Sequence, residues 1–114
     1  MSVKLSTRQV GDVSVIDVSG RITLGEGSSA LRDTLRDMVS KGQKKILLNL
    51  GEVSYIDSSG IGELVSGFTT VANQGGQLKL LSLTKRVKDL LRMTKLLTVC
   101  DVYDDEAGAV RSFS

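Results

Sequence analysis

The sequence contains no histidine, and Cys100 is its single cysteine. Histidine is the usual general base beside a catalytic serine or cysteine, and it is a frequent metal ligand. Its absence excludes Ser-His-Asp sites, Cys-His sites and histidine-containing metal centres, and we expect no metal site. Cys100 lies in the apolar stretch 97–102, where a small buried side chain is expected rather than a reactive thiol.

Aromatic residues are also scarce, with two Tyr, two Phe and no Trp. The formal net charge is only +2, and the basic residues are spread singly or in short pairs such as Lys44-Lys45 and Lys85-Arg86. Proteins that bind single strands use aromatic stacking platforms, and most nucleic-acid binders present a concentrated basic surface. Nucleic acid is therefore not an expected partner.

Long apolar runs are missing as well. No stretch approaches the roughly 20 apolar residues that span a bilayer, and residues 1–4 do not begin a signal-peptide core. We therefore expect no direct membrane insertion and a cytoplasmic location. A chain of 114 residues fits one domain, which we expect to cover residues 1–114.

The apolar pattern predicts strands and helices in alternation. Strands are expected at 3–10, 13–18, 44–50, 77–83 and 99–103, and Gly11-Asp12 suits the turn between the first two. Helices are expected after a loop over 20–27, after the segment 57–60, after Thr84 and after Asp104. Ser28 or Ser29 is expected to cap the first helix, and Thr84 the third.

This order predicts an α/β fold with a mixed sheet of about five strands and about four helices. The first two strands form an antiparallel hairpin, and the centre is mainly parallel, with 44–50 in a central position because it is apolar on both faces. Functional loops of such sheets follow the carboxyl ends of strands. The loop 20–27 and the segment 57–60 both follow strand ends, so we expect them to lie side by side.

The segment Tyr55–Leu64 places two adjacent hydroxyls and two glycines where a strand gives way to a helix. A helix start has unpaired N–H donors and the positive end of the helix dipole, so it tolerates a phosphate. Ser58 is therefore a candidate phosphoacceptor; alternatively, Ser58 or Ser59 only caps the helix. Gly60 and Gly62 each cost a helix roughly 1 kcal/mol relative to alanine, which a cap alone does not require. Their lack of side chains suits close approach by another protein.

Other readings of this segment are weaker. Asp57 either forms a local Asx-turn or orients the neighbouring hydroxyl. A dinucleotide fingerprint would need a third glycine where Val65 stands, and no usual base is available for a serine nucleophile. Glu63 is expected to be solvated. The apolar stripe of the helix is expected to be core: Ile61, Leu64, Val65, Phe68, Val71 and Ala72.

Leu48-Asn49-Leu50 followed by the segment 53–62, VSYIDSSGIG, resembles the bacterial anti-sigma factor antagonists of the STAS family. The resemblance extends across nearly the whole chain, through Gly20-Arg21-Ile22, Gly75-Gly76, 91–96 and 105–107. It implies a single STAS-like domain that is not an enzyme and uses no cofactor.

The resemblance also implies partner switching. The unphosphorylated protein would bind an anti-sigma factor that is a serine kinase and thereby release the sigma factor. Phosphorylation of Ser58 would end the binding, and a phosphatase would restore it. Many family members carry an acid where this chain has Thr23. The residues implied to bind the partner are Thr23, Asp57, Ser58, Ser59, Gly60, Ile61 and Gly62.

Two other functions are compatible with the same resemblance. A STAS domain can be an accessory subunit of a lipid-transport ABC complex, with no phosphorylation involved. Nucleotide binding at the same loop has also been suggested for the family. No exposed apolar stripe is evident beyond the helical core faces, which favours a monomer.

Overall fold

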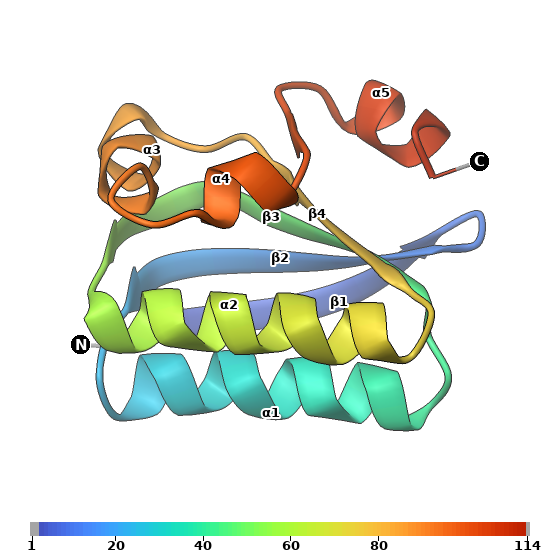
Figure 1. Ribbon diagram of the computed structural model, residues 1–114, viewed down its shortest axis with the longest axis horizontal. Helices are drawn as coiled ribbons and strands as arrows, with labels where there is room; N and C mark the ends of the chain where they lie inside the picture. Colours follow the sequence, from blue (N-terminus) through green and yellow to red (C-terminus); the bar gives the residue numbers. More distant parts are fainter. Residues whose placement is uncertain (1–2, 114) are drawn as a thin grey trace.

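The computed structural model describes residues 3–113 as one α/β domain around a five-stranded sheet (Figure 1). The strands follow one another across the sheet in sequence order. They are β1 (Val3–Val10), β2 (Val13–Ile22), β3 (Lys45–Ile56), β4 (Gln77–Leu81) and β5 (Val102–Tyr103). β1 and β2 are antiparallel, and every later pair is parallel, so the predicted mixed sheet is confirmed.

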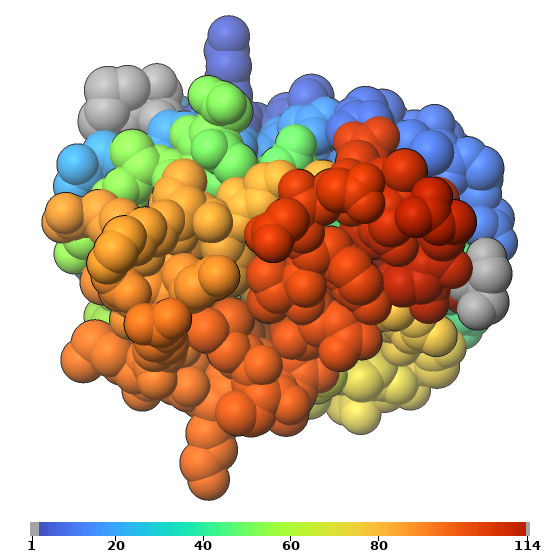
Figure 2. All heavy atoms as spheres, turned by 90° about the horizontal axis from the view of Figure 1, so that it is seen from above, coloured from blue at the N-terminus to red at the C-terminus, as the bar shows by residue number. Residues whose placement is uncertain are grey.

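Five helices cover the two faces of this sheet. They are α1 (Glu26–Ser40), α2 (Ser58–Asn73), α3 (Lys85–Leu91), α4 (Leu96–Val99) and α5 (Glu106–Arg111). α1 and α2 run side by side (Figure 1), and α3 and α4 contribute buried side chains to the same core, whereas α5 packs on the other face of the sheet. Figure 2 shows α3 and α4 in orange beside α5 in red, with the blue N-terminal hairpin left visible along one side.

Two groups of buried apolar side chains hold the layers together. The larger group includes Ile16, Leu31 and Leu64, all at most 1% exposed, and joins the sheet to α1, α2 and the α3–α4 region. The smaller group lies under α5 and includes Leu47 and Phe113. Burying a side chain of this size stabilises the fold by about 1.5–3 kcal/mol. Packing therefore fixes both faces of the sheet.

Several element boundaries differ from the predictions. β2 and β3 are longer than expected, because apolar side chains such as Ile22, Val53 and Ile56 keep contacting the core beyond the predicted ends. β4 ends at Leu81 because Ser82 takes a positive φ of 60°, which breaks the extended backbone.

The first helix begins earlier than expected. Its N-cap is Gly25, so the prediction that Ser28 or Ser29 caps it is wrong; Ser28 lies inside the helix and is buried. Gly25 has a φ of 99°, a conformation that glycine adopts without strain. α4 was not predicted, because its four residues are too few to show a helical period.

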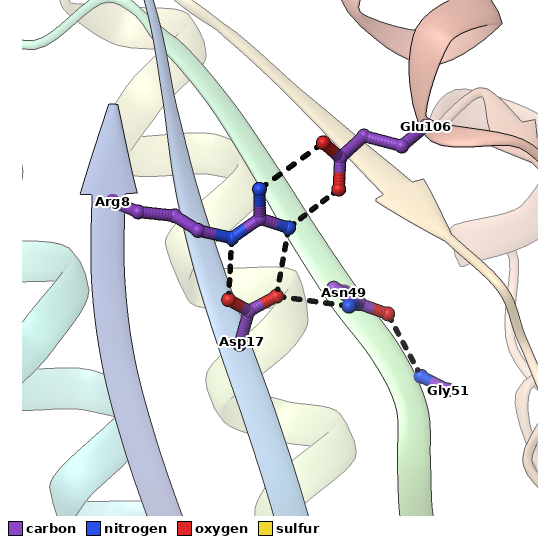
Figure 3. A network of polar contacts seen from close by, with 5 residues as sticks. All are labelled: Arg8, Asp17, Asn49, Gly51 and Glu106. Carbon is purple, nitrogen blue, oxygen red and sulfur yellow. Dashed lines mark hydrogen bonds and ion pairs between the residues drawn. The ribbon is translucent and has the colours of Figure 1, made fainter. Parts of the chain in front are cut away.

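Helix α5 is fastened to the sheet by polar contacts at both ends. Near its start, the Arg8 guanidinium donates hydrogen bonds to both carboxylate oxygens of Glu106 and also to Asp17 (Figure 3). Beyond its end, the Lys79 ammonium donates to the Ser112 carbonyl at 3.0 Å. A six-residue helix has little stability of its own, so these contacts and the small core keep it in place.

No helix within residues 3–113 has both the length and the apolar character needed to cross a membrane.

Candidate functional site

Asp57 is the residue that caps helix α2. Its Oδ1 accepts a hydrogen bond from the Gly60 backbone N–H at 2.9 Å, and its backbone is extended, as an N-cap requires. Ser58 and Ser59 are the first two residues of the helix, so the alternative in which one of them caps it is wrong. The Ser58 side chain is exposed, and within residues 3–113 its hydroxyl makes no hydrogen bond. The hydroxyl therefore remains accessible to another protein.

The same aspartate joins the helix start to the loop that follows β2. Its Oδ2 accepts a hydrogen bond from the Leu24 backbone N–H at 2.9 Å, and its own N–H donates to the Ile22 carbonyl at 3.2 Å. The prediction that the two segments lie side by side is confirmed. The N–H groups of Gly60 and Leu24 hold the pKa of the Asp57 carboxyl below its usual value. Asp57 thus carries a negative charge at neutral pH beside Ser58.

The two glycines of the helix start have different reasons to be there. A Cβ on Gly60 would collide with the Ile22 carbonyl oxygen and would lie 2.7 Å from Cγ1 of Ile56. Gly60 is thus required by the close packing of α2 against the ends of β2 and β3. A Cβ on Gly62 would meet nothing within 4 Å. Packing does not explain Gly62, which leaves its part of the exposed surface flat.

A shallow groove of about 300 Å³ runs between the start of α2 and the end of α3. Its lining is mostly apolar and includes Ile61, Leu90 and Met93 beside Ser58. Met93 is 85% exposed and Leu24, in the neighbouring loop, is 78% exposed. These apolar side chains come from separate segments of the chain and are exposed singly, so the sequence expectation of no exposed apolar stripe stays a prediction. Val65, expected in the core, is also 42% exposed.

The predicted partner-binding residues lie together at the start of α2, with Gly60 buried beneath the others and Thr23 in the adjoining loop. Asp57 to Gly62 are contiguous at the helix start, with Ile61 half-buried against the core. Thr23 belongs to the adjoining loop, half-buried, and its carbonyl accepts the Ser28 N–H at 2.9 Å. Thr23 is therefore next to the residue that Asp57 binds, Leu24. Thr23 lies beside the site because the backbone N–H of its neighbour Leu24 is hydrogen-bonded to Asp57.

The sequence reading missed a cluster of two arginines on one tyrosine. The guanidinium of Arg21, at the end of β2, lies 4.9 Å from the centre of the Tyr55 ring, and that of Arg86, in the first turn of α3, lies 5.2 Å from it. Arg21 and Tyr55 are paired in the β2–β3 register. The motif Gly20-Arg21-Ile22 pointed to Arg21, but nothing in the sequence connects it to Arg86. Tyr55 also lines the groove beside Ser58.

Two further predictions concern residues outside this surface. Cys100 is 4% exposed, and burial raises the pKa of its thiol to about 12, so the expectation of a structural cysteine is confirmed. Glu63 is not fully solvated: its side chain is 23% exposed, and its carboxylate lies 3.9 Å from the Arg32 guanidinium on α1.

Comparisons with known proteins agree with this architecture. The profile of the STAS domain family matches residues 4–109. The anti-sigma-B factor antagonist of Bacillus subtilis (strain 168) is 30% identical over 111 residues, which are 97% of this chain and 100% of that protein. An anti-sigma factor antagonist from Mycobacterium paratuberculosis has the same fold, with a TM-score of 0.88 at 19% identity over 98% of this chain and 94% of that one. The Bacillus cell fate determinant SpoIIAA in its phosphorylated form aligns with a TM-score of 0.77 at 18% identity, over 97% of this chain and all of that one.

Proposed function

This chain belongs to the STAS domain family, and on that premise we propose that it is an anti-sigma factor antagonist controlled by phosphorylation of Ser58. In its unphosphorylated form it binds an anti-sigma factor that is also a serine kinase, and the sigma factor is released. The kinase then transfers a phosphoryl group to Ser58, the complex dissociates, and a phosphatase restores binding. The protein acts in the cytoplasm as a regulatory partner and substrate, not as an enzyme.

The exposed hydroxyl of Ser58 is the observation that carries this proposal. Asp57 already satisfies the N–H of Gly60, so Ser58 has no capping role that would hold its side chain against the backbone. A kinase needs a hydroxyl that it can reach, and this one stands on the first turn of a 16-residue helix. The dipole of that helix favours the negative charge that phosphorylation adds.

The surface around Ser58 has the composition of a protein contact. Met93 lines the mostly apolar groove that contains Ser58, and Leu24 is exposed in the loop that Asp57 holds beside the helix start. The flat surface at Gly62 lets a partner approach the hydroxyl. A phosphate in this position adds about −1.5 to −2 charges at the centre of the contact. Its desolvation opposes binding, and a loss of about 3 kcal/mol would lower the affinity more than a hundredfold.

The test is a quantitative pull-down from the native cytoplasm, with bound proteins identified by mass spectrometry. The baits are the wild-type chain, Ser58→Asp and Thr69→Asp. Thr69 is exposed on α2 about 16 Å further along the axis, so its variant adds the same charge outside the proposed contact. We expect wild type and Thr69→Asp to capture a kinase-like ATPase and Ser58→Asp to lose it, with all three chains equally folded.

Three other outcomes would count against the proposal. Equal capture of the ATPase by Ser58→Asp would show that charge at Ser58 does not control binding. Capture of the same ABC-transporter subunits by all three baits would instead favour the accessory-subunit function. Saturable binding of labelled ATP or GTP by the purified chain would favour a nucleotide site at the loop.

A further inference from the structure

We propose that Arg21 and Arg86, stacked on Tyr55, form a receptor for an acidic segment of the partner protein. This inference rests on the proposed function, because it names the chemistry by which that partner is recognised. The two arginines lie 65 positions apart in the sequence and meet only in the folded chain. Both side chains are exposed at the end of the molecule that carries Ser58.

The two guanidinium groups have no acidic partner within residues 3–113. Arg8, Arg32 and Arg92 each lie within ion-pair distance of a carboxylate, whereas Arg36 and Arg111, like this pair, do not within the described residues. Two positive charges on one ring repel each other, and no carboxylate within the described residues offsets this repulsion. A bound carboxylate would relieve this repulsion between the two positive charges. The guanidinium group suits it, because it can form two parallel hydrogen bonds to a carboxylate.

Stacking also prepares the arginines for binding. A long arginine side chain normally loses rotamer freedom when it binds, and this loss lowers affinity. Contact with Tyr55 already restricts both side chains, at 4.9 and 5.2 Å from the ring centre. Less entropy is then lost when an acidic group binds. The tyrosine is thus the platform that holds the receptor together.

The surroundings favour an acidic protein segment over an uncharged one. Residues 85–92, which form α3 and its C-cap, contain four basic residues and one acidic residue, a local net charge of +3, whereas the whole chain carries +2. Leu90 of this helix and Met93, just past its C-cap, both line the groove. A segment that combines carboxylates with apolar side chains would match both features.

The receptor also gives the phosphorylation switch a local mechanism. Tyr55 and Ser58 line the same groove, so a phosphate on Ser58 places its negative charge beside the arginine pair. That charge partly cancels the attraction of Arg21 and Arg86 for the partner's acidic segment. The partner is then released without any change of fold.

The direct test is an NMR titration of the labelled chain with hexaglutamate at low salt. We expect saturable shifts of the Arg21 and Arg86 side-chain Nε–Hε signals and of nearby backbone amides. The double variant Arg21→Gln, Arg86→Gln should bind the peptide about tenfold more weakly, as expected for the loss of two exposed charge contacts. The control Lys4→Gln, Arg36→Gln removes the same charge from β1 and α1 and should bind like wild type. Tyr55→Leu should weaken binding while both charges remain.

Three results would overturn the receptor. Shifts spread evenly over all basic residues would indicate non-specific attraction, as would an equal loss in the control variant. If inorganic phosphate or ATP binds the arginine pair more tightly than hexaglutamate does, the pair is a phosphate site. If Tyr55→Leu binds hexaglutamate as well as wild type does, stacking on Tyr55 is not needed for binding.

The pull-down separates this inference from the proposed function. If the arginine double variant captures as much kinase-like ATPase as wild type while Ser58→Asp captures none, the switch stands and the receptor is wrong. If hexaglutamate binds the arginine pair but the wild-type chain captures no ATPase, the acidic-ligand site stands and the proposed function is wrong.

Discussion

The Asp57 carboxylate accepts a hydrogen bond from the backbone N–H of Leu24, 33 positions earlier in the chain, at 2.9 Å. Its other oxygen caps α2 by accepting the Gly60 N–H. One side chain therefore sets both the start of the helix that carries Ser58 and the position of the loop beside it. Any movement of Asp57 displaces both halves of the proposed partner surface together.

Replacing Asp57 with alanine should therefore loosen both the start of α2 and the loop beside it. Loss of a helix cap costs about 1 kcal/mol, and the freed Leu24 N–H lies near solvent, where water replaces the carboxylate. We expect urea denaturation to show a loss of about 1–2 kcal/mol and hydrogen exchange to be faster at Leu24 and Gly60. Asp57→Asn, which keeps an oxygen acceptor, is the control and should retain most of the stability. Unchanged exchange at Leu24 in the alanine variant would show that Asp57 does not hold the loop.

Alanine substitutions at the two glycines of α2 should change stability in opposite directions. A methyl group on Gly60 would meet the Ile22 carbonyl and the Ile56 side chain, and such overpacking costs about 1–3 kcal/mol. A methyl group on Gly62 meets nothing, so the higher helix propensity of alanine should raise the free energy of unfolding by about 0.5–1 kcal/mol. Urea unfolding of both variants measures this difference. Equal destabilisation would mean that Gly62 is also required by packing.

The sheet and the helix start could be predicted because their signals are local. The apolar run at 44–50 identified the central strand, and the Thr84 cap was correct: its Oγ1 accepts the Val87 N–H at 3.1 Å. Three adjacent side chains at 57–59 could all cap α2, and the choice of Asp57 depends on its extended backbone and on Leu24. A sequence pattern does not contain that information.

Contacts between distant segments could not be predicted for a different reason. Arg21 meets Arg86 at Tyr55, and Arg8 meets Glu106, only after the sheet has formed and α3 and α5 have packed against it. Charged residues that look scattered along the sequence become neighbours in this way. The local concentration of positive charge near Ser58 is thus a property of the fold.

The Cys100 thiol should be unreactive in the native chain. It is buried in the larger core, and burial raises its pKa to about 12, so almost no thiolate exists at neutral pH. A thiol reagent such as DTNB should give no signal from the folded protein at pH 7 and one thiol per chain after unfolding in urea. Rapid labelling of the native chain would show that the core opens around Cys100 and would contradict its structural role.

Arg8 should make the stability of the chain depend on pH through Asp17 and Glu106. Hydrogen bonds from the Arg8 guanidinium hold the pKa of both carboxyls below their usual values. A carboxyl with a depressed native pKa stabilises the fold fully above its unfolded pKa, near 4, and this contribution is lost as the pH falls through the native value. Because Arg8 and Glu106 are 41% and 39% exposed, solvent screening limits each pair to about 1 kcal/mol or less.

Arg8→Gln should accordingly lower the free energy of unfolding at pH 7 by about 1 kcal/mol and have a smaller effect at pH 2, because protonation of the two carboxyls removes their attraction to Arg8. Urea unfolding of wild type and variant at the two pH values measures the difference. Lys45→Gln is the control, since it removes one exposed pair with Asp12 and should change stability less than Arg8→Gln does. In the variant, hydrogen exchange should also be faster in α5, because Arg8 is the contact that ties Glu106 to the sheet. A loss of the same size at both pH values would assign the role of Arg8 to packing by its aliphatic stem rather than to its charge.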